Sequence, residues 1–107
     1  MNSTKATKPG SSTTENIRMI TKTTAIVNRA GLHARSSAKL AEVAAGFSSD
    51  IRIGVGARAV DGKSILSLMM LAATQGTTVS LEADGADESD AIATLVALFE
   101  DGFGESL

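Results

Sequence analysis

Hydrophobic positions follow two different periods along the chain, and the alternation between them predicts seven elements. Apolar residues that alternate, or β-branched runs, predict four strands, at 19–28, 50–55, within 56–62 and at 77–84. Apolar residues spaced three and four apart predict three helices, at 34–45, 63–76 and 84–104. Gly46 and Gly76 lie where the first two helices are expected to stop. The order βαββαβα predicts an α+β fold, with a four-stranded, mainly antiparallel sheet covered on one face by three helices.

The same spacing predicts which side of each helix faces the core. The second helix is expected to bury the stripe formed by Ile65, Leu68, Met69 and Ala72. Leu66 and Met70 then turn partly outward, so that this helix is more apolar than one buried face requires. In the third helix the expected core residues are Ile92, Leu95, Val96 and Phe99. Asp87 is the expected N-cap of that helix.

The first 17 residues show no hydrophobic periodicity. They are rich in Ser and Thr and hold the only proline, so we expect a disordered leader at 1–17 before one domain at 18–107. The chain has no apolar run of the roughly 20 residues that span a bilayer and no signal-peptide pattern, which predicts a cytoplasmic protein without membrane insertion. With no cysteine, one histidine and scattered acidic residues, neither a metal site nor another cofactor is expected.

Charge is distributed unevenly. From Ile17 to Lys63 there are eight Lys and Arg against three acidic residues, whereas from Ser64 to Leu107 there are eight acidic residues and no Lys or Arg. The basic half favours an acidic partner or an anionic group. No dense basic cluster with stacking aromatic residues accompanies it, so nucleic acid is not an expected partner.

The stretch GLHARSSAKL, residues 31–40, holds the only histidine, His33, immediately before the first predicted helix. The N–H groups of a first helical turn lack internal acceptors and carry partial positive charge, so an anion attached to the ring would meet donors there. Arg35 adds a planar fork that suits phosphate oxygens. The same positive field disfavours the imidazolium, so we expect a neutral, nucleophilic ring that accepts phosphate covalently.

Other interpretations of these residues remain open at this point. His33 is also compatible with a surface histidine that merely precedes a helix. Ser37, one turn further along, would face His33 in a Ser–His hydrolase, but no third orienting group is legible in the sequence. An acid–base role would likewise need an orienting carboxylate.

GLHAR at 31–35, followed by VDGKSILSLMMLAATQGTTVSLEADGADE and an apolar closing helix, closely resembles the histidine-containing phosphocarrier (HPr) family of the bacterial phosphoenolpyruvate-dependent phosphotransferase system. The resemblance spans about residues 19 to 105. It implies the open-faced β-sandwich of that family and, as expected for a carrier rather than an enzyme, a monomer without cofactors. It further implies that enzyme I phosphorylates His33 on Nδ1 and that a IIA domain then receives the phosphate.

The resemblance also assigns residues around His33. Arg35 matches the active-centre arginine of the family, whereas Ser36 stands where the family usually has proline. Proline suits a first helical turn, so we expect the helix to begin less rigidly here. The hydroxyls of Ser36 and Ser37 are assigned to the phosphate-binding set.

Ser64 precedes the second helix and has two readings. Its hydroxyl is expected to cap the helix. By resemblance it also matches the regulatory serine that an HPr kinase/phosphorylase modifies in some bacteria. The apolar residues beside it, Leu66, Met69 and Met70, are assigned to partner docking, because methionine suits surfaces that serve several partners.

Three alternatives to a sugar-linked phosphocarrier stay open. The first is a nitrogen-related or purely regulatory phosphotransfer protein of the same family. The second is a small acylphosphatase-like enzyme that uses Arg35 and Asn28. The third is a regulatory module that binds without covalent chemistry.

Overall fold

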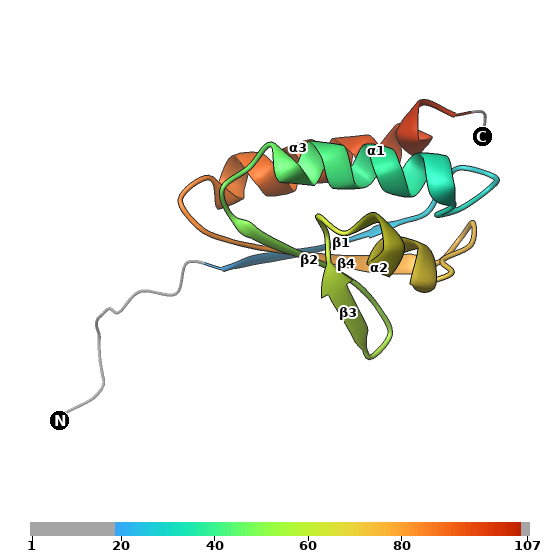
Figure 1. Ribbon diagram of the computed structural model, residues 1–107, viewed down its shortest axis with the longest axis horizontal. Helices are drawn as coiled ribbons and strands as arrows, with labels where there is room; N and C mark the ends of the chain where they lie inside the picture. The colour runs from blue at the N-terminus through green and yellow to red at the C-terminus, as the bar shows by residue number, and fades with distance from the viewer. Residues whose placement is uncertain (1–18, 106–107) are drawn as a thin grey trace, which may run out of the picture.

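The computed structural model describes residues 19–105 (Figure 1). The predicted leader at 1–17 lies outside the described residues. In chain order the elements are β1 (Ile20–Ala25), α1 (Ala34–Ala45), β2 (Asp50–Val55), β3 (Arg58–Asp61), α2 (Ile65–Met70), β4 (Thr78–Asp84), α3 (Glu88–Glu100) and a 3₁₀ turn, η1 (Gly102–Gly104). The predicted order βαββαβα is confirmed, and η1 is an addition after the last helix.

The four strands form one sheet in the order β1-β4-β2-β3, and each neighbouring pair is antiparallel. Alternation along β4 buries Val79, Leu81 and Ala83, and Ile53 of β2 lies opposite Leu81 in the register. Figure 1 shows α1 and α3 lying along one face of the sheet, with α2 beside α1. The α+β class and the helices on one face are as predicted.

The core lies between this sheet face and the helices, and it is almost wholly aliphatic. Helix α1 contributes Leu40, Ala41 and Ala44, while Val43 and Phe47 pack at its margin. The helix ends at Ala45, as predicted, because Gly46 closes the last turn by donating its N–H to Val43. This packing fixes α1, whose first residue follows His33.

Helix α2 is shorter than the spacing predicted. It ends at Met70 instead of continuing to Gly76 because Ala72 takes a left-handed φ of 53°. The segment after it pairs with the loop before α1: Ala73 accepts a hydrogen bond from the Leu32 N–H at 2.9 Å, and Gly76 donates to Ile26 at 2.8 Å. These tertiary bonds replace the helical ones that the local pattern favoured.

The predicted core stripe of α2 is therefore wrong in part. Leu68 is fully buried, but Ile65, Met69 and Ala72 are exposed. Within the six residues of α2, only Leu68 is buried. The side chains that the spacing assigned to the interior instead enlarge an apolar surface.

Helix α3 buries Ile92, Leu95 and Phe99 as predicted, while Val96 is only half-buried. It ends at Glu100, before η1, in which Phe103 is buried with a left-handed φ of 58° and packs edge-on against Phe99. Asp87 occupies the N-cap position, but its side chain makes no capping bond, which corrects the predicted role. Its carboxylate instead accepts from the backbone N–H groups of Ser48 and Ser49.

Within residues 19–105, no helix has both the length and the apolar character needed to cross a membrane.

Candidate functional site

His33 occupies the N-cap position of α1, and its side chain is 36% exposed. Its backbone is extended, and its Nδ1 accepts a hydrogen bond from the Arg35 N–H at 3.3 Å. One of the unpaired amides of the first turn is therefore satisfied by the imidazole itself. His33 therefore lies at the electropositive end of the helix, as predicted, and it is Nδ1 that faces the first turn.

Ser36 strengthens the start of α1. Its Oγ accepts from the His33 N–H at 2.9 Å and donates to the Gly31 carbonyl at 2.8 Å. Together with the contact from Nδ1 to Arg35, this forms a capping box. The serine that stands where the family usually has proline thus ties the helix to the preceding loop, and the expectation of a less rigid helix start stays a prediction.

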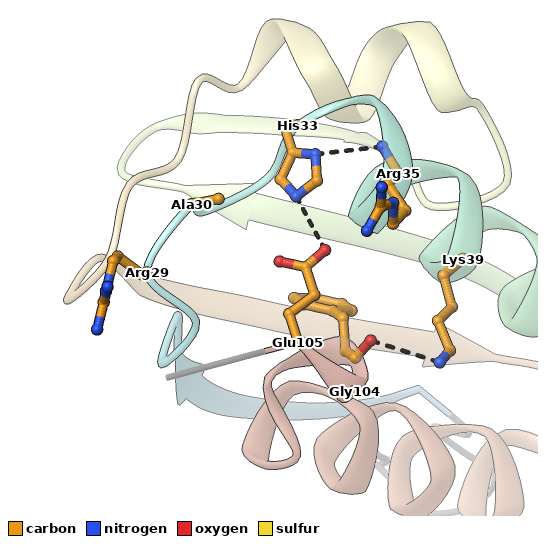
Figure 2. Close-up of a pocket in the computed structure, with 8 residues that line it drawn as sticks. Arg29, Ala30, His33, Arg35, Lys39, Gly104 and Glu105 are labelled. Atoms are coloured by element: carbon orange, nitrogen blue, oxygen red, sulfur yellow. Dashed lines mark hydrogen bonds and ion pairs between the residues drawn. The ribbon is translucent and has the colours of Figure 1, made fainter.

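The other ring nitrogen contacts a carboxylate from the far end of the chain. His33 Nε2 lies 2.9 Å from Glu105 Oε2 (Figure 2). Glu105 Oε1 accepts a hydrogen bond from Asn28 Nδ2 at 2.9 Å. An ionised carboxylate only accepts hydrogen bonds, so Nε2 carries the ring proton in this arrangement. Nδ1, which accepts from Arg35, is then left with the lone pair.

The Glu105 carboxyl is electrostatically matched to this position. Burial raises its pKa, but the hydrogen bonds from Asn28 and His33 and the positive charge of Arg35 outweigh burial, so the pKa lies below its ordinary value. The Glu105 side chain is 15% exposed. It is therefore a shielded anion next to the ring.

The ring and the carboxylate line an open cleft of about 700 Å³. Its walls are formed by Arg29, Ala30, His33, Arg35, Lys39, Phe103, Gly104 and Glu105. In Figure 2 the Arg35 and Lys39 side chains lie along α1, and Lys39 Nζ donates to the Phe103 carbonyl at 3.4 Å. The cleft thus combines a basic helix face with one anion.

Other residues predicted for the site lie inside the protein. Ser36 and Ser37 are fully buried, and the Ser37 Oγ has no hydrogen-bond partner within residues 19–105. Neither residue lines the cleft. Asn28 is also fully buried, with its Nδ2 bound to Gly31 and Glu105. An anion in the cleft would meet backbone N–H groups and Arg35 instead of these side chains.

Ser64 caps α2, as predicted, by accepting from the Ser67 N–H at 3.3 Å. The helix then presents an exposed apolar surface, which we call the α2 patch, formed by Ile65, Leu66, Met69 and Met70. Leu66 and Met70 are the most exposed, at 73% and 67%. The hydrogen bond from Leu32 to Ala73 connects the segment after this helix to the residue before His33.

Glu105 was not among the residues predicted for the site. It lies 72 positions from His33 and outside any motif, so no spacing signal pointed to it. Among the described residues, no group of three or more His, Cys, Asp or Glu side chains could hold a metal ion.

The chain is similar to proteins of one known family. Residues 20–101 match the family model described as the PTS HPr component phosphorylation site. The phosphocarrier protein HPr of Cupriavidus necator is 49% identical over 87 residues, which cover 81% of this chain and 98% of that protein. The crystal structure of HPr from Thermoanaerobacter tengcongensis is 43% identical, with a TM-score of 0.79 over 82% of this chain and 99% of that one.

The chain therefore belongs to the HPr family of phosphocarrier proteins of the phosphotransferase system. Proteins of this family carry a phosphoryl group and are not catalysts. A further matching structure is an HPr dimer from T. tengcongensis, at 45% identity and a TM-score of 0.65 over 75% of this chain and 92% of that one. The expectation of a monomer is therefore not confirmed.

Proposed function

We propose that His33 accepts a phosphoryl group on Nδ1 from phosphorylated enzyme I and passes it to a IIA domain in the cytoplasm. The observation that carries this proposal is that the two ring nitrogens have different partners. Nδ1 lies at the start of α1 against the Arg35 N–H, whereas Nε2 is occupied by Glu105.

The proposed transfer is a displacement at phosphorus. The Nδ1 lone pair forms the new N–P bond while the bond between phosphorus and the donor breaks, and its electron pair stays on the donor. The ring proton remains on Nε2. In the second transfer a nucleophile of the IIA domain forms the new bond to phosphorus, and Nδ1 recovers its lone pair.

Backbone groups supply the proposed phosphate contacts. Once phosphorus occupies Nδ1, the Arg35 N–H is released from the ring and can donate to a phosphate oxygen. The remaining amides of the first turn and the Arg35 guanidinium add positive potential. Contact from the Ser36 or Ser37 hydroxyl would require the start of α1 to rearrange, because both side chains are buried.

The α2 patch is the proposed docking surface for both partners. Leu66, Met69 and Met70 are exposed on it. The basic residues of the cleft lie on α1 and the loop before it, and the hydrogen bond from Leu32 to Ala73 joins that loop to the segment after α2. An acidic partner with an apolar centre would match this combination of surfaces. Substituting Leu66 by Lys is expected to weaken enzyme I binding about tenfold, the loss of one well-buried interface anchor, as measured by titration calorimetry.

Ser64 is the proposed regulatory site, for an HPr kinase/phosphorylase. Its hydroxyl caps α2 beside the docking surface. A phosphate there adds a charge of about −2 without removing a core contact. We expect it to weaken the docking of acidic partners while the fold is kept.

The test is labelling with enzyme I and radiolabelled phosphoenolpyruvate. Wild-type protein should take up one acid-labile phosphate per chain, and His33→Ala should take up none. Ser64→Ala is the matched control and should be labelled normally. Label that persists in His33→Ala would overturn the proposal, and ³¹P NMR of the wild-type product identifies the nitrogen.

The nitrogen-related alternative uses the same chemistry at His33. Offering labelled protein to a sugar-specific and to a nitrogen-related IIA domain separates the two by the rate at which each removes the label. The acylphosphatase-like alternative is disfavoured, because the Asn28 amide that it requires is buried and directed at Glu105.

A further inference from the structure

The Glu105 carboxylate is held from two sides by residues that lie far from it in the sequence. One oxygen faces His33 Nε2 at 2.9 Å (Figure 2). The other accepts a hydrogen bond from Asn28 Nδ2 at 2.9 Å. The turn η1 brings it there, with Phe103 buried beneath and Lys39 bound to the Phe103 carbonyl. Glu105 is therefore fixed in place as well as charged.

The Asn28 amide can be oriented in only one way. Its Nδ2 donates to the Gly31 carbonyl and to Glu105, which are both acceptors. A flipped amide would place its oxygen against a carbonyl and a carboxylate. The price of the observed orientation is that the buried Oδ1 lacks a partner within the described part of the chain. A buried amide that is left half-satisfied is costly, so this arrangement calls for an explanation beyond packing.

We propose that Asn28 and Glu105 are positioning residues for His33: Asn28 holds the Glu105 carboxylate on Nε2, which keeps the ring proton there and leaves Nδ1 as the nucleophile. This inference rests on the proposed phosphorylation of His33. In this proposal the choice of nitrogen is enforced by a buried amide that does not line the cleft.

The contact also matters after transfer. When Nδ1 forms its bond to phosphorus and the donor bond breaks, the ring retains the Nε2 proton and gains positive charge. The Glu105 anion lies against the N–H that carries that proton and stabilises the charged ring. Removing the anion should therefore slow the uptake of phosphate.

The first test measures the ring tautomer without any phosphorylation. Long-range ¹H–¹⁵N NMR of the wild type should show the proton on Nε2. In Glu105→Gln the amide offers either a donor or an acceptor to the ring, so a second tautomer should appear. Glu100→Gln removes a charge from the end of α3, where the side chain is exposed, and should leave the wild-type tautomer. An unchanged tautomer in Glu105→Gln would overturn the proposal, whatever the labelling shows.

The second test asks whether Asn28 acts through Glu105. Labelling rates with enzyme I are compared for wild type, Asn28→Ala, Glu105→Ala and the double variant. Each single change should slow labelling about 3- to 10-fold, the range for losing a partly shielded charge-assisted hydrogen bond. In the Glu105→Ala background, Asn28→Ala should have no further effect.

If Asn28→Ala slowed labelling equally in the wild-type and Glu105→Ala proteins, the proposal would be overturned, because Asn28 would then act only through the fold and not through Glu105. Failure of the proposed function gives a different result. In that case wild-type protein itself takes up no label, while the tautomer measurement still reports on Asn28 and Glu105.

Discussion

Two carboxylates, one near each end of α1, are both held in their ionised form by hydrogen bonds, but they serve different roles. Asp87 lies near the end of α1, where it accepts from the Ser48 and Ser49 N–H groups and from the Ser49 hydroxyl. Glu105 lies near the start of α1, where it accepts from Asn28 and faces His33. In both cases hydrogen bonds to the ionised form lower the pKa of the carboxyl.

The difference lies in the partners. The groups that bind Asp87 cannot change charge near neutral pH, so the contact stays the same there and fastens the α1–β2 loop to the start of α3. Glu105 faces an imidazole, whose charge changes during the proposed transfer. A carboxylate surrounded by fixed donors acts as a structural anchor. A carboxylate that faces a reactive ring is suited to control the tautomer and charge of that ring.

The largest expected effect comes from Phe103, which is buried in the core two residues before Glu105. Phe103→Ala removes a buried ring that packs edge-on against Phe99 with centroids 5.0 Å apart. We expect a loss of about 3 kcal/mol in the free energy of unfolding, measured in urea, and slower phosphorylation because η1 no longer holds Glu105. Phe47→Ala, half-buried at the Asp87 end, is the control and should cost less stability without slowing phosphorylation. Normal phosphorylation of Phe103→Ala would show that η1 does not position Glu105.

The next effect concerns the Asp87 end and depends on pH. The Ser49 hydroxyl and the Ser48 N–H lower the pKa of Asp87 to about 2 from 3.8. Because the folded pKa is depressed, the stabilisation is fully present above about pH 4 and is lost as the pH falls toward 2. Asp87→Asn should therefore have a lower Tm at pH 7 and lose less stability between pH 4 and pH 2, as followed by thermal unfolding.

Asp101→Asn, at an exposed position, is the control for this comparison and should keep the pH profile of the wild type. Asp87→Asn should also be phosphorylated at the normal rate, because the His33 end is untouched. A Tm at pH 7 equal to that of the wild type would mean that the anchor contributes nothing.

The smallest expected effect separates two roles of His33. The Nδ1 contact to Arg35 caps α1, so His33→Ala should cost about 1 kcal/mol in the free energy of unfolding. Asparagine is also a favourable N-cap, so His33→Asn should recover most of that loss while remaining unphosphorylated. Chemical denaturation of the three proteins measures the difference. If His33→Asn were no more stable than His33→Ala, the imidazole would not act as a cap.

Local patterns predicted most of the fold, but of the site they predicted His33 at the start of α1 and not the carboxylate that faces it. The strands, α1 and the placement of His33 before a helix follow from short-range spacing and from Gly46. The end of α2 did not, because bonds from Leu32 and Ile26 to the following segment compete with the helix. Asn28 was named only for an alternative enzyme, and its pairing with Glu105 could not be predicted, because a contact across 77 residues leaves no trace in local periodicity. Asp87 was predicted to cap α3 because it occupies the N-cap position, but its side chain accepts from the N–H groups of Ser48 and Ser49 instead.

The close approach of Gly31 to Ala73 has a practical consequence for protein engineering. A Cβ at position 31 would lie 2.4 Å from the Ala73 oxygen, so even alanine would push apart the loop that carries His33 and the segment that follows α2. Gln75 adds a further tie to Val27. Anyone who transplants the acceptor loop to another scaffold must therefore move residues 71–77 with it, as a single interlocked graft.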